Sequence, residues 1–494
     1  MKLIVRVLLG FVFVIAALGI TIAVVVIPPS PLIPPKQGLT LENVTWIVPG
    51  QSRASNQRIV IEGSFITEVE PHEERPAHGA ASDAAQAADF SGAFVMPGLT
   101  DVHVHFPPPS LPGQTELFAF LHLYHGITAA RDAGDVTGTA SAPALEGIGS
   151  GAFAGPRLVS CGYFLDGPDP RWGNSIVVET PEQGRAAVRR VVAEGFECVK
   201  AYDGLDRDSL DAIREEAERL GLPVMGHTPR RVPYEQARLD DAQHLIGIPP
   251  PFDGEAPRFP LILEGWLRLG DERREAMIDA ALEFGIANTP TLVTIDRLLA
   301  TRDYEALVEE REFQLLPSFY RNIVWSPIGG ISAARGLNAA DFDMIEDAFE
   351  VMLETVKRMH ERGVRLHSGT DTLVAFIVPG AALHRELRLL ARAGLSPEEV
   401  LEISMVQSAQ AVGGSKYGRI EPGAPAELVI FAEDPTLSLD ALDSIVGVVR
   451  DGRLYTREML DDQLDRYRAH FENRLYESLL RPLVRSVVAS TAPD

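Results

Sequence analysis

Residues 93–105 read Ala93-Phe-Val-Met-Pro-Gly-Leu-Thr-Asp-Val-His-Val-His105, an apolar run that ends in two histidines spaced by one residue. Side chains alternate along a β-strand, so His103 and His105 would share one face and could bind the same metal ion. Val104 would point the other way, into the core. By itself, this pair is equally consistent with two hydrogen-bonded histidines that bind no metal. The rest of the chain must decide between the two interpretations.

Short apolar segments follow this first predicted strand (95–105) and alternate with amphipathic helical patterns. One of the helices, residues 208–220, begins with a capping residue and ends at Gly221. The other predicted strands are 127–132, 157–163, 197–202, 223–227, 241–245, 286–291 and 364–371. Eight such units predict an α/β fold, a (β/α)8 TIM-type barrel over residues 93–417. The active site of such a barrel lies at the carboxyl ends of its strands.

The two ends of the chain predict a second, smaller domain. Residues 39–92 and 418–456 contain short strand-like pieces separated by turn residues, and together they predict a β-sandwich. In residues 457–494, apolar side chains recur at helical spacing, which predicts a C-terminal helix that ends before Pro482. We expect this helix to pack against the barrel or against a partner.

The N-terminus carries the pattern of a membrane anchor. Lys2 and Arg6 precede an uncharged run over residues 7–27, which as a helix would match the ~30 Å hydrocarbon core of a bilayer. This length favours an uncleaved signal anchor (1–27) over a cleaved signal peptide, and the leading positive charges place the rest of the chain outside the cytoplasm. That compartment would be the periplasm in a Gram-negative bacterium. Residues 28–38 are a predicted Pro-rich linker.

Composition excludes several classes of protein. The net charge of -24 would repel nucleic-acid phosphates, so we expect no nucleic-acid partner. Two cysteines, Cys161 and Cys198, are too few for a disulfide scaffold or a cysteine-rich zinc site. We expect them to be two buried thiols on neighbouring strands rather than a disulfide. A homo-oligomer is compatible with the sequence, which does not fix the oligomeric state.

In the barrel prediction, further polar residues reach the same rim as the histidine pair. Lys200 lies on the fourth strand among apolar neighbours, and His227, His244 and Asp371 lie at the fifth, sixth and eighth strands. Each alone has an ordinary explanation, such as a paired lysine, a hydrogen-bonded histidine or a helix cap. Together they predict a metal site, in which a Lys200 amine carboxylated by carbon dioxide would form an anionic bridge.

Seven motifs in this order resemble the amidohydrolase superfamily, over nearly all of residues 39–455. They are Met96-Pro-Gly-Leu-Thr-Asp-Val-His-Val-His105, Gly126-Ile-Thr-Ala-Ala-Arg-Asp132, Val199-Lys-Ala-Tyr-Asp-Gly204, Gly226-His-Thr-Pro229, Gln243-His-Leu-Ile-Gly247, Ser368-Gly-Thr-Asp-Thr372 and Gly418-Arg-Ile-Glu-Pro-Gly-Ala-Pro-Ala-Glu-Leu428. They look most like the branch of imidazolonepropionase-like proteins and of dipeptidases that release proline, arginine or lysine. The resemblance also implies the barrel and a split β-sandwich at its flank.

The resemblance further implies a binuclear centre of two divalent cations, with zinc expected. It assigns His103, His105 and Asp371 to one ion and His227 and His244 to the other, with carboxylated Lys200 bridging them. Two zinc ions would create a bridging hydroxide near neutral pH and polarise the scissile carbonyl. Asp371 would then act as base and acid in turn. Tyr202, two residues beyond Lys200, would contact the carbonyl oxygen or a substrate carboxylate, although a plain packing role is an equal alternative.

The chain departs from the family pattern at three positions. Gln243 stands where members often have Glu, His367 where they have a small residue, and Ser408 where an Asn is common. Strand alternation places His367 inside the barrel beneath the metals, where we expect a buried, hydrogen-bonded histidine.

Four other features are weaker candidates. His122 and His125 are expected on the surface of the first helix, although one of them could reach the mouth. Arg131 and Asp132 could form a salt bridge inside the barrel. Residues 297–338 are longer than a plain connection and are a candidate lid.

These observations predict a membrane-anchored metal-dependent hydrolase of C–N bonds, with a dipeptide or an N-acyl amino acid as substrate. A cyclic-amide hydrolase or a deaminase on the same barrel is the first alternative, although Lys200 argues against a single-metal deaminase. The second alternative is a catalytically inactive, membrane-tethered binding module.

Overall fold

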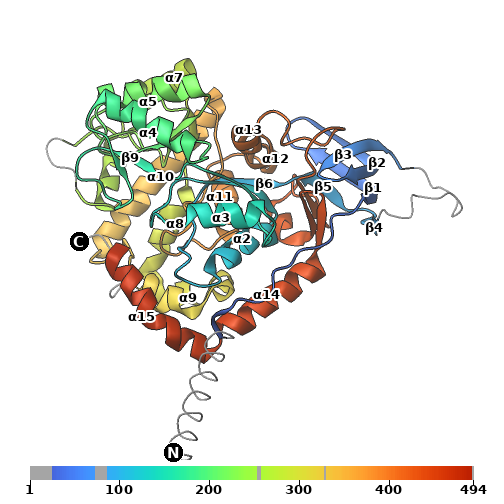
Figure 1. The fold of residues 1–494 in the computed structure, drawn as a ribbon. Coiled ribbons are helices and arrows are strands. Elements are labelled where there is room, and N and C mark those ends of the chain that lie inside the picture. Colours follow the sequence, from blue (N-terminus) through green and yellow to red (C-terminus); the bar gives the residue numbers. More distant parts are fainter. Residues whose placement is uncertain (1–24, 73–85, 253–256, 327–329, 492–494) are drawn as a thin grey trace, which may run out of the picture.

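The computed structural model describes residues 25–72, 86–252, 257–326 and 330–491 (Figure 1). Most of the predicted membrane anchor, residues 7–24, lies outside the described residues. Within the described ranges, no helix is both long and apolar enough to cross a membrane.

Parallel strands form the centre of the molecule and are arranged in two sheets. The first contains β6, β7 and β8, and the second has the order β10-β9-β11-β12-β13-β14. The bounds are β6 Leu99–Val104, β7 Ile127–Asp132, β8 Arg157–Ser160, β9 Phe164–Asp166, β10 Ile176–Val177, β11 Val199–Ala201, β12 Val224–Gly226, β13 Asp241–Gln243 and β14 Ala287–Thr289. Helices surround these strands, which confirms the predicted α/β class (Figure 1).

The predicted eighth strand, residues 364–371, closes the ring between β14 and β6 through backbone hydrogen bonds rather than as a regular strand. The amide of His367 donates to the carbonyl of Asn288, and the amide of Val102 donates to the carbonyl of Ser368, both at 2.9 Å. This segment therefore joins the last strand of one sheet to the first strand of the other.

The other junction lies at the third predicted strand, 157–163, where β8 ends at Ser160 and the next strand, β9, begins only at Phe164. The amide of Glu197, just before β11, donates to the carbonyl of Ser160 at the end of β8 (2.9 Å). β9 then pairs with β11 through Phe164 and Lys200. The strands thus form one closed ring.

In the described part of the chain, twelve α-helices lie between these strands or between the last of them and the second sheet. They are α2 Gln114–Tyr124, α3 Ser141–Gly149, α4 Pro181–Ala193, α5 Arg207–Leu220, α6 Tyr234–Ala237, α7 Asp271–Phe284, α8 Leu292–Ala300, α9 Tyr304–Val308, α10 Ala339–Arg362, α11 Ala381–Arg392, α12 Pro397–Glu402 and α13 Ser408–Gly413. Helix α5 shows the expected local signals, but its capping residue lies two positions before the predicted one, Asp208. The Asp206 side chain caps it by accepting from the amide of Ser209, and it ends at Gly221 with φ 74°.

Alternation along the ring strands separates the core from the site. On β11, Val199 and Ala201 pack in a buried apolar cluster that includes Val188 of α4 and Ile213 of α5. Lys200, between them, faces the interior of the ring and is 1% exposed. The same alternation directs Val104 into the main hydrophobic core and leaves the histidines on either side of it for the interior.

The stretch predicted as one strand over 95–105 is in fact two strands in different sheets. β5 (Phe94–Pro97) belongs to the sheet formed by the chain ends, and β6 belongs to the ring. The change of sheet occurs at Gly98, where a Cβ would lie only 2.0 Å from the Thr128 hydroxyl. Only a glycine leaves room for that approach.

Both chain ends contribute to a second, smaller sheet domain, as predicted, and its described strands are hydrogen-bonded into one sheet. Its order is β17-β16-β15-β5-β1-β2-β3, with β4 also paired to β1. The bounds are β1 Leu39–Val48, β2 Ser52–Glu62, β3 Phe65–Pro71, β4 Gln86–Asp89, β15 Leu428–Phe431, β16 Ile445–Arg450 and β17 Arg453–Thr456. β5 pairs with both β1 and β15, so it joins the two halves edge to edge.

The C-terminal segment differs from its prediction. Two helices, α14 (Arg457–Phe471) and α15 (Arg474–Thr491), replace the single helix expected before Pro482, which lies inside α15. Proline removes one helical hydrogen bond, to the carbonyl four residues earlier. That residue is Ser478, which is exposed, so water can satisfy its carbonyl.

The described part of the candidate lid, 297–338, is packed into the body. Arg297 is 1% exposed and forms ion pairs with Asp296, Glu310 and Glu312. Further along, the ring of Trp325 contacts the rings of Phe313, Tyr320 and Phe376 in the core.

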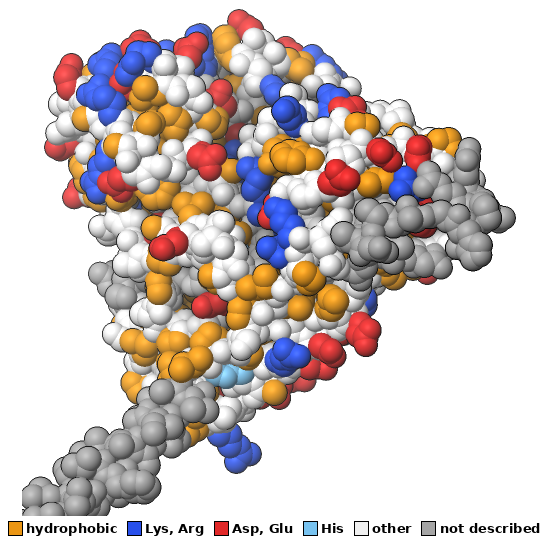
Figure 2. All heavy atoms as spheres, turned by 45° about the vertical axis from the view of Figure 1, so that its right-hand side comes forward, with side chains coloured by type: hydrophobic (Ala, Val, Ile, Leu, Met, Phe, Trp, Pro, Cys, Tyr) orange, Lys and Arg blue, Asp and Glu red, His pale blue; other side chains and the backbone are white. Residues whose placement is uncertain are grey.

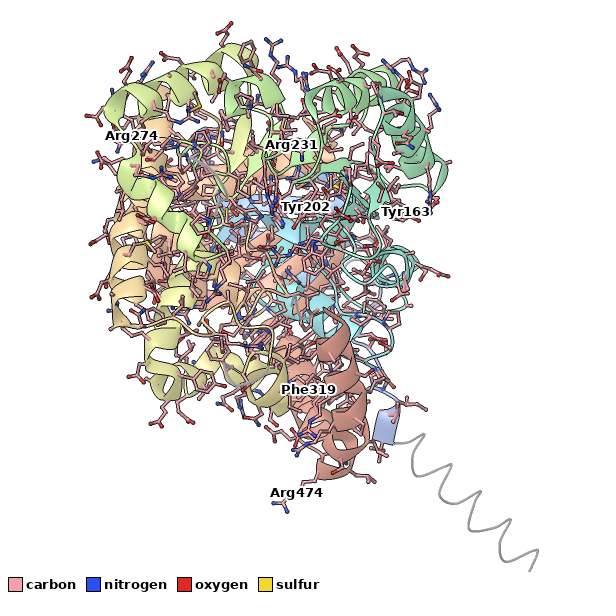
Figure 3. The ribbon with its side chains drawn as sticks, turned by 90° about the vertical axis from the view of Figure 1, so that its left-hand side faces the viewer. Tyr163, Tyr202, Arg231, Arg274, Phe319 and Arg474 are labelled. Atoms are coloured by element: carbon pink, nitrogen blue, oxygen red, sulfur yellow. A yellow bond between two sulfur atoms is a disulfide. The ribbon has the colours of Figure 1, made fainter. Side chains whose placement is uncertain are left out.

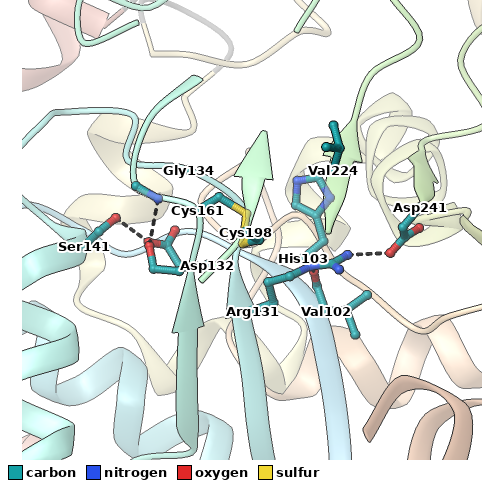
Figure 4. The surroundings of a disulfide bond; sticks show 12 residues. Val102, His103, Arg131, Asp132, Gly134, Ser141, Cys161, Cys198, Val224 and Asp241 are labelled. Carbon is teal, nitrogen blue, oxygen red and sulfur yellow. Dashed lines mark hydrogen bonds and ion pairs between the residues drawn. A yellow bond between two sulfur atoms is a disulfide. The ribbon is translucent and has the colours of Figure 1, made fainter. Parts of the chain in front are cut away.

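The two cysteines form a disulfide, which corrects the expectation of two thiols (Figure 4). Cys161 directly follows β8 and Cys198 directly precedes β11, and both are fully buried. The hydrogen bond between Glu197 and Ser160, their neighbours in sequence, aligns the two segments. Sequence alternation could place the cysteines on neighbouring strands, but it could not give this register.

We expect a C161A/C198A variant to lose about 2–4 kcal/mol of unfolding free energy, because the bond closes a loop of 37 residues in the unfolded chain. Urea unfolding with and without a thiol reductant measures this loss. The reductant should destabilise the wild type and leave the variant unchanged. Two free thiols in unreduced, unfolded wild-type protein would contradict the disulfide.

Candidate metal centre

Six residues predicted from the sequence gather at one end of the ring. His103 lies on β6 and His105 directly follows it, Lys200 lies on β11, His227 and His244 directly follow β12 and β13, and Asp371 ends the closing segment. The Asp371 carboxylate lies in the middle of the histidines. Its Oδ1 is 3.3 Å from His103 Nε2 and 3.2 Å from His105 Nε2, and its Oδ2 is 4.0 Å from His244 Nε2.

Another ligand candidate, His227, adjoins this group. The ring of His227 lies 5.0 Å from that of His244, centroid to centroid. One ligand atom each from His103, His244 and Asp371 lie within 4.8 Å of one another, which is close enough to surround one ion.

Each of the four histidines has its Nδ1 held by a hydrogen bond to an oxygen acceptor. The pairs are His103 with Gln243 Oε1 (2.5 Å), His105 with the Gly134 carbonyl (2.6 Å), His227 with Asp203 Oδ1 (2.7 Å) and His244 with the Thr291 hydroxyl (2.6 Å). A histidine that donates from Nδ1 carries its lone pair on Nε2. This is the tautomer and the supporting contact that metal-binding histidines use.

Electrostatics favour neutral imidazoles at most of these positions. Burial lowers the pKa of His103 to about 3 and lowers those of His227 and His244 below their usual value. Burial also lowers the pKa of His105, but hydrogen bonding and attraction to Asp371 outweigh it and leave a net rise. Neutral imidazole is the form that binds a cation.

Lys200 is the most costly group in the site. Its amine has no hydrogen bond or ion pair with any described residue, and burial lowers its pKa to about 7 despite the attraction of Asp371. A buried amine without a partner is destabilising unless another group satisfies it. The donor set around it, imidazole nitrogens and a carboxylate, is the kind that binds divalent metals.

Two ligand candidates have strained backbones. His244 and Asp371 both adopt the left-handed region, with φ 59° and 63°, which costs a non-glycine residue on the order of 1 kcal/mol or more. The structure retains these conformations because the adjacent amides are fixed. The amide of His244 donates to the Thr289 carbonyl, and that of Asp371 donates to the His103 carbonyl.

Tyr202 lies at the edge of this group. Its ring stacks on His227 at 4.3 Å, and its hydroxyl accepts a hydrogen bond from Trp172 Nε1 (3.0 Å). Burial raises the pKa of Tyr202 well above its usual value, so its hydroxyl keeps its proton. Trp172 was not predicted, because nothing in its loop sequence marks it as a neighbour of Tyr202.

A charged network lies beneath the site. Arg131 Nη2 donates to Asp241 Oδ2 at 2.5 Å, and His367 Nδ1 lies 3.1 Å from the same oxygen (Figure 4 shows the arginine contact). Burial raises the pKa of Asp241, but Arg131 and His367 together hold it well below its usual range. His367 is thus the buried, hydrogen-bonded histidine that was expected, and Arg131 forms the expected internal salt bridge.

The weaker histidine candidates lie outside the site. His122 and His125 are on or just after α2, and each has its Nδ1 hydrogen-bonded to the carbonyl four residues earlier. His122 is fully buried rather than on the helix surface, and burial lowers its pKa to about 4. Ser408 has a local role, because its hydroxyl accepts from the amide of Ser368 in the closing segment (3.0 Å).

Comparison with known proteins agrees with this geometry. The amidohydrolase family matches residues 94–247 and 330–456, and the chain belongs to that family. A curated relative, adenine deaminase 2 of Rhizobium meliloti (strain 1021), is 24% identical over 404 residues, which are 79% of this chain. The chain spans about half the length of that relative (53%).

Solved structures share the fold. A Xaa-Pro dipeptidase with bound methionine aligns with a TM-score of 0.61 at 20% identity, covering 85% of this chain and all of the other. The bottromycin amidohydrolase aligns with a TM-score of 0.67 at 24% identity, covering 88% of this chain and 91% of the other. The A. niger ochratoxinase aligns with a TM-score of 0.60 at 19% identity, covering 85% of this chain and 96% of the other.

We expect D203N to weaken metal binding by about 10- to 100-fold, because His227 loses the carboxylate that orients it. Competition with a chromophoric chelator measures the affinity. D211N is the matched control, since Asp211 pairs with Arg207 on the surface of α5. Unchanged metal affinity in D203N would show that His227 is not a ligand.

Proposed function

We propose that this amidohydrolase-family protein hydrolyses a C–N amide or peptide bond with two divalent cations, zinc being the first to test. The observation that carries the proposal is the set of four histidines whose Nδ1 atoms are hydrogen-bonded and whose Nε2 atoms remain for ligation. His103, His105 and Asp371 would hold one ion, and His227 and His244 the other. The cations would supply an activated water near neutral pH and polarise the scissile carbonyl.

Lys200 fits the role of a bridge after carboxylation. Carbon dioxide reacts with a neutral amine to give a carbamate and one released proton. Burial lowers the pKa of Lys200 to about 7, so a large share of the amine is neutral at neutral pH. The resulting anion would satisfy a buried position that has no other partner among the described residues.

The protein's own side chains would handle the proton and the substrate. The Asp371 carboxylate would accept a proton from the attacking water and pass it to the leaving nitrogen. Tyr202, which keeps its proton, would donate a hydrogen bond to the carbonyl oxygen or to a substrate carboxylate. Its stacking on His227 and its contact with Trp172 hold the hydroxyl in place.

An unpaired arginine beside Tyr202 supports a substrate with a free carboxylate, such as a dipeptide or an N-acyl amino acid. The Arg171 guanidinium lies over the Trp172 ring, 5.2 Å from its centroid, and its charge acts on the Tyr202 hydroxyl. It is exposed and has no ion pair or side-chain hydrogen bond with any described residue. Arg231, labelled with Tyr202 in Figure 3, is likewise exposed and unpaired within the described ranges.

We also propose that residues 7–27 anchor the protein and that the hydrolase lies outside the cytoplasm. The uncharged N-terminal run supports this location. The Cys161–Cys198 disulfide also supports it, because such bonds persist in oxidising compartments.

Lys200 tests the proposed function as a whole. We expect the K200A variant to lose bound metal, because the two cations would lose their bridge. Its kcat on a dipeptide library should fall by at least about 100-fold. K357A, on the exposed face of α10, is the control variant. Metal analysis and amino-acid release are measured together, with ammonia release as the sign of a deaminase. A wild-type protein without stoichiometric metal and without turnover of any amide would exclude the proposal.

Arg171 tests the substrate class. We expect R171M to raise KM for a dipeptide by about 10- to 100-fold, because one charge-assisted contact to the carboxylate is lost. KM for the C-terminal amide of the same dipeptide should barely change, and R171K should retain part of the preference. R189M, on the surface of α4, is the control. Equal changes in KM for the dipeptide and for its C-terminal amide would show that Arg171 does not bind the carboxylate.

A further inference from the structure

Helix α15 presents an unusual exposed face. Leu475, Leu479 and Leu483 recur every four residues and remain 43%, 36% and 37% exposed. They form a row along the helix, while Tyr476 and Leu480 pack inward. Such a row on a helix that already buries its other side indicates a second contact surface.

The charges on α15 differ from those of the rest of the chain. Arg474, Arg481 and Arg485 are exposed, and none of them has an ion pair with a described residue. The one acid of the helix, Glu477, accepts a hydrogen bond from the Ser318 hydroxyl and is therefore directed toward the body. The net charge of the whole protein is -24, whereas α15 carries a row of exposed leucines together with these unpaired arginines. That combination is typical of helices that lie on anionic membrane surfaces.

The described chain begins beside this helix. The Ser30 carbonyl accepts from Gln463 of α14 (3.2 Å). Gly113 lies between Pro28 and Phe471, the last residue of α14. A Cβ atom on Gly113 would lie 3.0 Å from the Cβ of Pro28 and 3.1 Å from the Cζ of Phe471, so Pro28 and Phe471 are neighbours. α15 starts three residues later, at Arg474, near the start of the described chain in Figures 1 and 3.

This corner carries further exposed apolar groups. Ile27 and Ile33 are 63% and 44% exposed, and Met459 of α14 is 37% exposed. Figure 2 shows hydrophobic side chains gathered beside the point where the described chain begins. The described chain, which starts at the end of the uncharged run, therefore begins beside the start of the leucine row of α15.

We propose that α15, together with Ile27 and Ile33, lies on the surface of the bilayer that the N-terminal run enters, with its arginines at anionic headgroups. The inference rests on the proposed anchor, and it adds a second, peripheral contact that fixes how the hydrolase is oriented. A second copy of the chain is a poorer occupant, because a two-fold contact through this helix would bring its unpaired arginines toward each other.

The test uses the full chain in nanodiscs that contain anionic lipid. A nitroxide label is attached through L479C, and L437C, 79% exposed and just beyond β15, is the matched control. The native cysteines are bonded to each other, so the new thiol is the one that reacts. Power-saturation spectroscopy compares the accessibility of each label to oxygen, which concentrates in lipid, and to a water-soluble nickel chelate.

We expect the oxygen-to-nickel ratio at position 479 to exceed that at position 437 several-fold. Equal, water-like ratios in protein that remains on the nanodiscs would overturn the surface contact and leave the anchor intact. Protein that is not retained by nanodiscs would contradict the anchor and the surface contact together. A short label-to-label distance between two copies would identify a second chain as the occupant and also overturn the proposal.

Discussion

Closure of the ring is the constraint on which the site depends. Residues 365–371 hydrogen-bond to Asn288 of β14 on one side and to β6 on the other, and the amide of Asp371 donates to the carbonyl of His103 at 2.7 Å. This single backbone contact brings an acid from the last part of the ring next to a histidine from its beginning. Without it, the two sheets would have open edges and the Asp371 carboxylate would not lie among the imidazoles.

The polar side chains inside the ring lie in layers, and each layer supplies hydrogen-bond partners to the next. Asp241 at the lower level accepts from Arg131 and the Thr289 hydroxyl and contacts His367, so a buried acid is held between two bases. Above it, Gln243 accepts from His103. A neutral amide therefore orients this histidine where related sequences often have a glutamate, and it does so without adding a charge. The pattern leaves Lys200 as the one buried cation in the ring that has no hydrogen bond or ion pair with a described residue.

The chemistry and the proposed membrane contact lie on different parts of the chain. The six candidate ligands come from the ring strands, whereas the exposed leucines and arginines come from α15, after the second sheet is complete. The second sheet links these parts, because β5 pairs with strands from both chain ends and continues directly into β6 and its histidines. The second sheet and the metal-ligand candidates on β6 are thus joined through adjacent segments of the chain.

The sequence by itself determined the α/β class and the groups that face the ring interior, because alternation and the residues at strand ends are local properties. His103, Lys200 and His367 were placed correctly for this reason. It did not determine the split of the first strand at Gly98, the disulfide, the helix that continues past Pro482, or the contact of Trp172 with Tyr202. The split at Gly98 depends on a close approach to Thr128, and the disulfide depends on the register between β8 and β11. The helix continues past Pro482 because the carbonyl of Ser478 is exposed, and the contact of Trp172 depends on the path of one loop. Such contacts join residues far apart in the chain, and only the tertiary structure decides them.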